Sequence, residues 1–300
     1  MTLDLERNRH LLLEVFPDDP KFTDPQFLEW QYTASPSGQV LEFNSDDGDG
    51  RLGHYAVLPQ RWVSPAGELK FALSLNTAVA SRGRGKGLFT TLAEETYKVA
   101  LVQGVDAIVG VANAQSTPGF LGKLGFSLVG PLDASILVPR PAGRKSPQVE
   151  RIGLVDLTQD TLERFMPKGD GVERHWDLAE LTWRLADPSK SFSLFATDEA
   201  LVVTCRTTQK GCPVAVILKI LTSRPNSLDM RRFVNAACRH HRAPVALYAG
   251  TNPAVILKGI TVPARLRPSP LNLIVKSLDT ARSVADCTPT TFEFLEFDAY

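Results

Sequence analysis

The feature that most constrains this chain is a glycine-rich hexad, Arg82-Gly83-Arg84-Gly85-Lys86-Gly87. Before it, residues 71–79 carry apolar side chains mostly at alternate positions, which is typical of a half-buried strand. After it, residues 88–102 repeat apolar side chains at helical spacing. Three glycines at every second position let the backbone turn and direct N–H groups into one concavity, where a helix N-terminus adds positive potential. The hexad therefore predicts a pyrophosphate-binding loop; the alternative is a glycine-rich turn with solvated basic side chains.

Spacing excludes two common phosphate loops. A Walker A loop would need glycine at Ala80 and a hydroxyl residue at Gly87, and a dinucleotide fingerprint would need its third glycine at Leu88. The pattern that fits is Arg-x-x-Gly-x-Gly between a strand and a helix.

A second segment supports this pattern. Residues 105–112 form a short apolar run typical of a buried strand, and Asn113 follows it. Further on lies Lys123-Leu124-Gly125-Phe126, in which Gly125 suits the turn that ends a helix. Together the two ordered motifs resemble the GNAT superfamily of acyl-CoA-dependent N-acyltransferases.

The second half of the chain echoes the first. Trp183 and Pro188 repeat Trp30 and Pro36, and a short strand before Asn252 repeats the one before Asn113. The hexad has no counterpart there. We therefore expect an α/β (α+β) chain of tandem GNAT-like domains, each a mixed, mostly antiparallel sheet flanked by helices. The expected division is 1–140 for the domain with the coenzyme A loop, 141–149 for a linker rich in proline and glycine, and 150–300 for a degenerate domain; the alternative is two unrelated α/β domains.

The arrangement is similar to a narrower group, the tandem-domain N-acyltransferases that modify nucleotide-linked amino sugars for surface polysaccharides. This resemblance rests on Trp30, Pro36, Gly38, Gly53, Leu58-Pro59, Thr77, Val79, the hexad and Asn113. It implies a site for an acyl-CoA cosubstrate, carrying an acetyl or short hydroxyacyl group, at Ala78, Val79, Arg82, Gly83, Arg84, Gly85, Lys86, Gly87, Leu88, Asn113 and Phe120. In this family a backbone N–H near Val79 polarises the thioester, and Asn113 would contact the pantetheine arm.

The chain departs from the family in its acid and base. The usual tyrosine acid is replaced by Leu121, and residues 71–79 contain no carboxylate. His54 is a candidate base because its ordinary pKa suits proton transfer near neutral pH, although a structural strand histidine is the alternative. The other catalytic candidates are Asn76 and Thr77, which could position a water, and Ser116, a weak acid.

Composition limits the partners. Lys plus Arg equals Asp plus Glu, at 33 each, so no net field favours nucleic acid or an anionic membrane. The four cysteines and five histidines lack metal-site spacing. We expect a cytoplasmic protein without a metal, a signal peptide, a membrane span or a nucleic-acid partner, and we allow for a homodimer.

The predicted function is transfer of an acyl group from acyl-CoA to the amine of an amino sugar, a small-molecule substrate linked to a nucleotide. Two alternatives stay open. One is a GNAT enzyme that acts on another small amine or on a peptide. The other is a non-catalytic acyl-CoA-binding module, which the missing tyrosine and glutamate would favour.

Overall fold

The computed structural model describes residues 3–141, 148–166, 171–225, 228–263, 265, 267 and 269–297. The chain divides into two compact units. Unit 1 comprises Met1–Pro131, Ala186–Ser189 and Pro270–Thr288, and unit 2 comprises Leu132–Leu185, Lys190–Ser269 and Pro289–Tyr300. Each unit contains one mixed, mostly antiparallel sheet with helices against it, so the expected fold class is confirmed.

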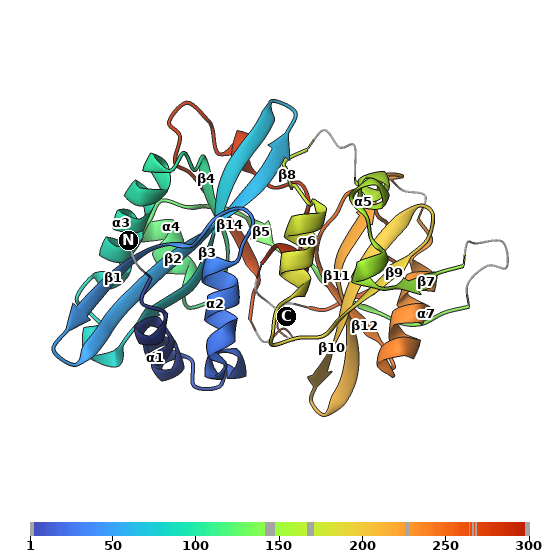
Figure 1. Ribbon diagram of the computed structural model, residues 1–300, viewed down its shortest axis with the longest axis horizontal. Coiled ribbons are helices and arrows are strands. Elements are labelled where there is room, and N and C mark those ends of the chain that lie inside the picture. Colours follow the sequence, from blue (N-terminus) through green and yellow to red (C-terminus); the bar gives the residue numbers. More distant parts are fainter. Residues whose placement is uncertain are drawn as a thin grey trace. The chain divides into compact units, whose positions relative to one another are not determined.

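The sheet of unit 1 has the strand order β1-β2-β3-β4-β14-β5 (Figure 1). Among the described strands of this order, β3 and β4 run parallel and the other neighbours are antiparallel. The elements of unit 1 are α1 (Leu5–Val15), η1 (Pro20–Thr23), α2 (Pro25–Thr33), β1 (Leu41–Asp47), β2 (Gly50–Ser64), β3 (Gly67–Val79), η2 (Ser81–Gly83), α3 (Leu88–Val102), β4 (Ala107–Ala112), α4 (Thr117–Lys123), β5 (Ser127–Pro131), β14 (Asn272–Ser277) and η5 (Ala285–Cys287).

Helices cover both faces of this sheet. Consecutive residues of a strand point to opposite faces. On β2, Tyr55 contacts Tyr97 of α3, whereas its neighbour His54 contacts Tyr32 of α2. The face with α3 and α4 therefore holds the apolar core cluster around Leu92 and its neighbours, and the face with α2 holds His54.

Unit 2 repeats this plan with the strand order β13-β6-β12-β11-β10-β9-β7, and β15 pairs with β12. Only β11 and β12 are parallel. Its elements are β6 (Ala134–Leu137), β7 (Glu150–Ile152), η3 (Leu154–Asp156), α5 (Gln159–Phe165), β8 (Glu173–Arg174), α6 (Leu178–Leu185), β9 (Phe192–Ala196), β10 (Ala200–Gln209), β11 (Cys212–Thr222), α7 (Met230–His241), β12 (Ala246–Thr251), β13 (Ile260–Thr261), β15 (Phe292–Glu293) and η6 (Phe294–Glu296).

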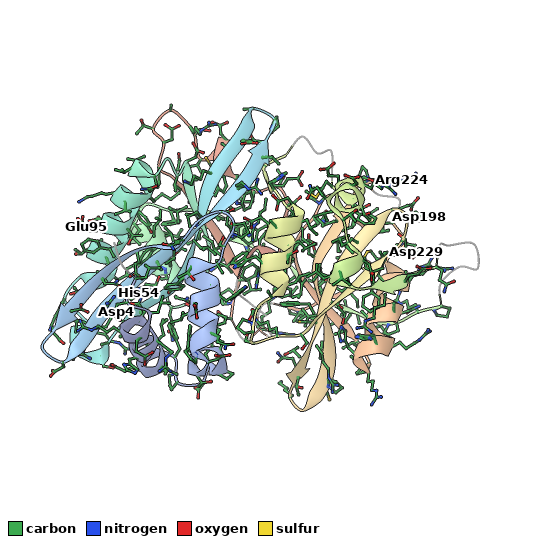
Figure 2. All side chains as sticks on the ribbon, viewed as in Figure 1. Asp4, His54, Glu95, Asp198, Arg224 and Asp229 are labelled. Carbon is green, nitrogen blue, oxygen red and sulfur yellow. The ribbon has the colours of Figure 1, made fainter. Side chains whose placement is uncertain are left out.

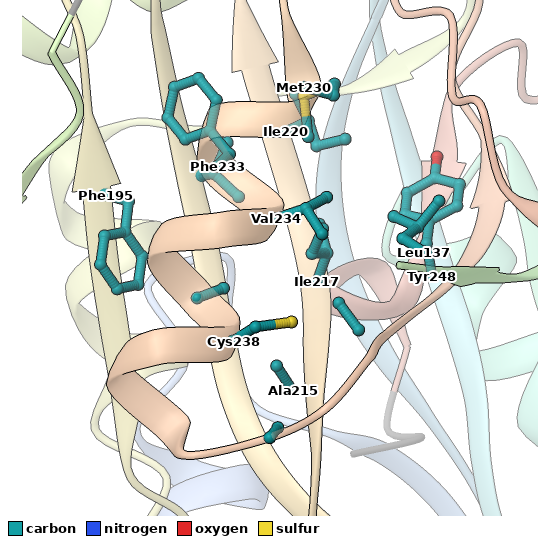
Figure 3. Close-up of a cluster of buried hydrophobic side chains, with 14 of the residues drawn as sticks. Leu137, Phe195, Ala215, Ile217, Ile220, Met230, Phe233, Val234, Cys238 and Tyr248 are labelled. Carbon is teal, nitrogen blue, oxygen red and sulfur yellow. The ribbon is translucent and has the colours of Figure 1, made fainter. Parts of the chain in front are cut away.

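Each sheet has, between two of its strands, a strand from the opposite half of the chain. β14, near the C-terminus, lies between β4 and β5 in unit 1, and β6, which precedes position 138, lies between β12 and β13 in unit 2. Figure 3 shows Leu137 of β6 beside Tyr248 of β12 in the core of unit 2. Likewise Ile274 of β14 belongs to the core of unit 1. The expected division at 1–140 and 150–300 therefore differs from the observed units at these two strands, and residues 142–147 of the expected linker lie outside the described residues.

In the described part of the chain, no helix has the length and apolar character needed to cross a membrane.

The exchange predicts that unit 1 needs β14 for its stability. Ile274 is 1% exposed, so Ile274→Ala removes buried methyl groups and leaves a cavity, with an expected loss of about 2–5 kcal/mol in unfolding free energy. Chemical denaturation measures this loss. Ile256→Ala is the control, because Ile256 is 60% exposed and its truncation should cost less than about 0.5 kcal/mol. Equal losses in the two variants would mean that β14 contributes no core packing.

Candidate functional site

The candidate site of unit 1 begins where two parallel strands separate. β3 and β4 pair at only three positions, from Phe71 opposite Ala107 to Leu73 opposite Val109. Beyond these pairs β3 continues to Val79 and β4 to Ala112 without pairing to each other. The facing edges of the two strands therefore offer backbone donors and acceptors to a ligand.

A β-bulge in β3 lies at this opening. The register with β2 shifts so that Asn76 and Thr77 both stand opposite Tyr55, and Asn76 has a positive φ of 48°. Asparagine is among the few residues that adopt this conformation readily. The bulge therefore turns the following residues, Ala78 and Val79, without a glycine.

The backbone N–H of Val79 points into the opening. Ala80 N donates to Leu52 O of β2 at 2.9 Å. Residues of an antiparallel pair alternate between bonding to one neighbouring strand and pointing to the other. The N–H of Val79 therefore faces the edge from which β4 has separated, where a thioester oxygen would need a donor.

The hexad forms the expected turn between β3 and α3. Gly85 and Gly87 have φ of 78° and 75°, and a Cβ on either would meet no atom within 4 Å. Among the described residues, no acceptor bonds the N–H groups of Gly85, Lys86 or Gly87. Gly87 is also the N-cap of α3 and provides no side-chain acceptor. Unpaired donors at a helix N-terminus suit a phosphate.

The three basic side chains of the hexad differ in their contacts. Arg82 Nε lies 3.1 Å from Asp47 Oδ2, and the Arg82 guanidinium also approaches Glu14 at 3.4 Å. The hydrogen bond from Arg82 holds the pKa of Asp47 below its usual range. Arg84 and Lys86 are exposed on the loop. Arg82 therefore anchors the loop to β1, and Arg84 and Lys86 remain available for a phosphate.

The α4 end of the site is organised by Asn113. Its Oδ1 accepts from the backbone N–H of Ser116 at 2.9 Å and lies 3.1 Å from Ser116 Oγ. These contacts hold the Ser116 hydroxyl against Asn113 just before α4. Asn113 is exposed, and its Nδ2 has no partner among the described residues. Phe120 is 6% exposed and packs edge-on against Phe89 and Phe126, so its ring is part of the core.

His54 lies in a sealed position. It is fully buried, with Nε2 2.7 Å from the Tyr32 hydroxyl and Nδ1 2.6 Å from Asn44 Oδ1 (Figure 2). Burial, with a smaller effect of the Arg51 charge, lowers the pKa of His54 to about 3. An imidazole with this pKa and two occupied nitrogens is a weak base near neutral pH, so the geometry favours the structural alternative for His54.

Aromatic side chains can stack on a sugar or base ring, but four of the large ones in this chain are buried. Trp30 is 9% exposed, Tyr32 0%, Trp176 1% and Trp183 7%. Their faces are packed in the units, so in this structure they offer no platform for a ring.

Unit 2 has the same opening, and the chain fills it. β11 and β12 separate after Ile217 and Tyr248, and β15 pairs with β12 beyond that point. Val79 and Ile220 both lie in the second pair after the bulge of their strand. The Ile220 N–H donates to Glu293 Oε2 at 3.4 Å. A carboxylate of the chain therefore occupies the donor that corresponds to the Val79 N–H.

The helix N-terminus of unit 2 is also occupied. Asp229 is the N-cap of α7, and its Oδ1 accepts from the N–H of Arg231 at 3.2 Å (Figure 2). A carboxylate at this position satisfies the helix and would repel a phosphate. Unit 2 thus holds its own anions at both places where unit 1 leaves donors available.

The role of the C-terminal segment was missed by the sequence analysis. Gly250 has φ of 149°, and a Cβ there would lie 2.6 Å from Phe292 O and 2.8 Å from Glu293 Cα. Lys219 Nζ lies 2.9 Å from Glu293 and also bonds Glu296. One feature of the sequence could have indicated this role: Lys219 stands alone in an apolar strand, and glutamates at 293 and 296 could pair with it.

No group of three or more histidine, cysteine, aspartate or glutamate side chains within the described ranges could hold a metal ion.

Comparison by sequence gives no match, either among protein-family models or among curated proteins. Comparison of structures does. The chain is similar to the GCN5-related N-acetyltransferase from Anabaena variabilis ATCC 29413, with a TM-score of 0.66 and 13% identity over 92% of this chain and 71% of that one. It is also similar to the GCN5-related N-acetyltransferase from Kribbella flavida, with a TM-score of 0.61 and 12% identity over 92% and 69% of the two chains.

A third similar structure is Eis1 from Mycobacterium abscessus, with a TM-score of 0.58 and 11% identity over 92% and 72% of the two chains. At these identities the likeness establishes the fold. The chain therefore has the fold of GCN5-related N-acetyltransferases, as expected from the hexad and the Asn113 segment, and the tandem arrangement expected from the echo of the first half in the second.

Gly85→Val tests the loop. The β-branched side chain disfavours the positive φ of Gly85 and enters the space above the unpaired N–H groups. We expect the affinity for acetyl-CoA, measured by calorimetric titration, to fall by at least about tenfold. Gly211→Val is a matched control in unit 2, since Gly211 has φ of 80° and equally open surroundings. Equal affinity in both variants would refute the loop assignment.

His54 predicts a pH dependence of stability. The unfolded chain binds a proton near pH 6.5 and the folded chain only near pH 3, so stability present above pH 6.5 is lost as the pH falls toward 3. Between pH 7 and pH 5 the expected loss is about 2 kcal/mol. Denaturant titration at the two pH values should show a loss about 2 kcal/mol larger in the wild type than in His54→Gln, because His241, whose pKa burial also lowers, to about 4, contributes its own loss in both proteins. His10→Gln, at an exposed residue of α1, serves as the control, and an unchanged loss in His54→Gln would contradict the prediction.

Proposed function

We propose that the chain is an N-acyltransferase that uses acyl-CoA bound to unit 1. One contrast carries the proposal. In unit 1 the Val79 N–H and the start of α3 leave donors available, whereas in unit 2 the corresponding donors are held by Glu293 and Asp229. In unit 2 the chain satisfies these donors itself, and in unit 1 it does not. This difference indicates that unit 1 binds a ligand with two separated anionic or carbonyl groups.

The residues fit an acyl-CoA cosubstrate. The N–H groups of Gly85, Lys86 and Gly87, with the side chains of Arg84 and Lys86, would hold the pyrophosphate. Asn113 Nδ2 would bond an amide of the pantetheine arm. When bound, the thioester supplies an activated acyl group and a thiolate leaving group. The Val79 N–H would stabilise negative charge on the thioester oxygen during attack by the amine.

Proton transfer falls to groups other than His54. The amine must be neutral to attack, and no carboxylate lies on β3 between Phe71 and Val79. We propose that the proton leaves through water at the site. Leu121 offers no acid, and a coenzyme A thiolate is a tolerable leaving group near neutral pH.

For the acceptor we propose an amino sugar, linked to a nucleotide. Support for this class is the resemblance of the first half to the sugar-nucleotide N-acyltransferases; the buried aromatic residues add none. Another small amine or a peptide amine is the second candidate. The carboxylates of the 46–49 turn do not argue for a cationic acceptor, because Asp46 pairs with Arg51 and Asp47 with Arg82.

The test is titration of the full chain with acetyl-CoA, followed by an assay of thiol release. We expect one micromolar site per chain, because unit 2 is filled by its own carboxylates. Two sites would refute the filled second unit, and no site would refute the proposal.

Acceptor class is tested by thiol release with a nucleotide-linked amino sugar, free glucosamine, a polyamine and a short peptide. Turnover with the first supports the proposed acceptor, and turnover with another amine retains the transferase and changes its substrate. Binding without turnover on any amine would indicate a non-catalytic acyl-CoA-binding module.

A further inference from the structure

A continuous run of buried and half-buried polar side chains leads to the bulge of β3. Glu42 on β1, Asn44 on β1, His54 on β2, Tyr32 on α2 and Asn76 on β3 form what we name the polar chain. Burying such groups costs free energy unless each is satisfied. A chain of five such groups, on the sheet face opposite the apolar cluster around Leu92, therefore calls for a reason beyond packing.

Successive contacts along the polar chain are short. Asn44 Nδ2 lies 2.7 Å from Glu42 Oε1, and Asn44 Oδ1 lies 2.6 Å from His54 Nδ1. His54 Nε2 lies 2.7 Å from the Tyr32 hydroxyl, and Asn76 Nδ2 lies 3.1 Å from the same hydroxyl. Each member therefore touches the next within hydrogen-bond distance.

The contacts at the Glu42 end of the polar chain determine which group donates and which accepts in each hydrogen bond. Arg51 can only donate, and its Nη1 bonds Asn8 Oδ1 at 2.7 Å. Asn8 must then donate through Nδ2 to Glu42 Oε2, also at 2.7 Å. Glu42 accepts there and accepts again from Asn44, which leaves Asn44 Oδ1 as an acceptor for His54 Nδ1–H.

The donor and acceptor roles can be followed from His54 to Asn76. An uncharged His54 with its proton on Nδ1 accepts at Nε2, so the Tyr32 hydroxyl donates to it. The hydroxyl then accepts from Asn76 Nδ2, whose other hydrogen goes to Gln31 Oε1 at 2.6 Å. Both donors of the Asn76 amide are used on the α2 side, and its Oδ1 has no partner among the described residues.

We propose that the polar chain fixes the Asn76 amide so that its Oδ1 accepts a hydrogen bond from the attacking amine of the acceptor. This rests on the proposed function. Asn76 is half-buried in the bulge, three positions before the Val79 N–H that would polarise the thioester. A neutral acceptor at this point directs one N–H of the amine and leaves its lone pair for the thioester carbon. Asn76 would touch the substrate, and Tyr32, His54 and Asn44 are positioning residues.

The direction of the bonds can be tested without activity. ¹⁵N NMR of the full chain at pH 7 should show His54 as the neutral tautomer with its proton on Nδ1. A proton on Nε2 would reverse the donor order, turn the Asn76 amide around and overturn the proposal.

Kinetics test the role of Asn76, using acetyl-CoA and the amine of the panel above that turns over fastest. Asn76→Gly keeps the positive φ and removes the amide, and we expect kcat to fall by about tenfold or more with unchanged affinity for acetyl-CoA. Tyr32→Phe removes one of the two hydrogen bonds that hold the Asn76 amide, and kcat should fall by about threefold to fivefold. Tyr32→Phe in the Asn76→Gly background should have no further effect, because both act through one amide.

Matched controls separate this role from stability. Lys210→Gly places glycine at another positive-φ residue (50°) in unit 2, and Tyr97→Phe removes another buried hydroxyl from the opposite face of the sheet. Both should keep the wild-type kcat. Turnover with an unchanged kcat in Asn76→Gly, or additive losses in the double variant, would overturn this inference alone. Absence of turnover with every amine would instead overturn the proposed function, and the inference with it.

Discussion

The structure of each unit depends on two parallel strands, β3 and β4 in unit 1 and β11 and β12 in unit 2, that pair at three positions and then separate. In a sheet, each backbone N–H and C=O at such an opening must find another partner. Unit 2 solves this within the chain, since the Ile220 N–H donates to Glu293 and the C-terminal strand β15 adds to β12. Unit 1 does not. The two units share one plan, and in unit 2 the opening holds an oxygen on the N–H after the bulge and an extended segment along β12. This filled opening is the basis for the ligand that we propose for unit 1.

The second unit is held together by contacts of its own at the place where it has no counterpart of the hexad. The C-terminal segment buries Phe292, Phe294, Leu295 and Phe297 and brings two glutamates to Lys219. Without that lysine, the two buried carboxylates would lack a counter-ion, and burying an unpaired charge strongly lowers the free energy of unfolding. Gly250 admits the segment by lacking a Cβ. These contacts depend on one another, so a pantetheine arm could enter unit 2 only by displacing part of its core.

The sequence predicted the local elements well and the long-range pairings poorly. The strand before the hexad, the helix after it and the positive φ of Gly125 follow from short-range patterns, and the structure contains all three. The exchange of β6 and β14 does not follow, because both are short apolar runs that fit either sheet. The burial of His54 was equally hidden, since alternation on β2 gives two faces and does not tell which face a helix will cover.

His54 illustrates why a residue type alone does not identify a base. Its imidazole lies between a hydroxyl and an amide, and burial keeps it uncharged. It can therefore accept one hydrogen bond and donate another without taking up a proton. A histidine kept neutral has one donor and one acceptor, which is what a chain of directed hydrogen bonds requires. A carboxylate in its place would accept at both ends and break the order between Asn44 and Tyr32. In our proposal, the polar chain directs Asn76 Oδ1 away from α2. It can do so only because His54, which the sequence suggested as a base, stays uncharged.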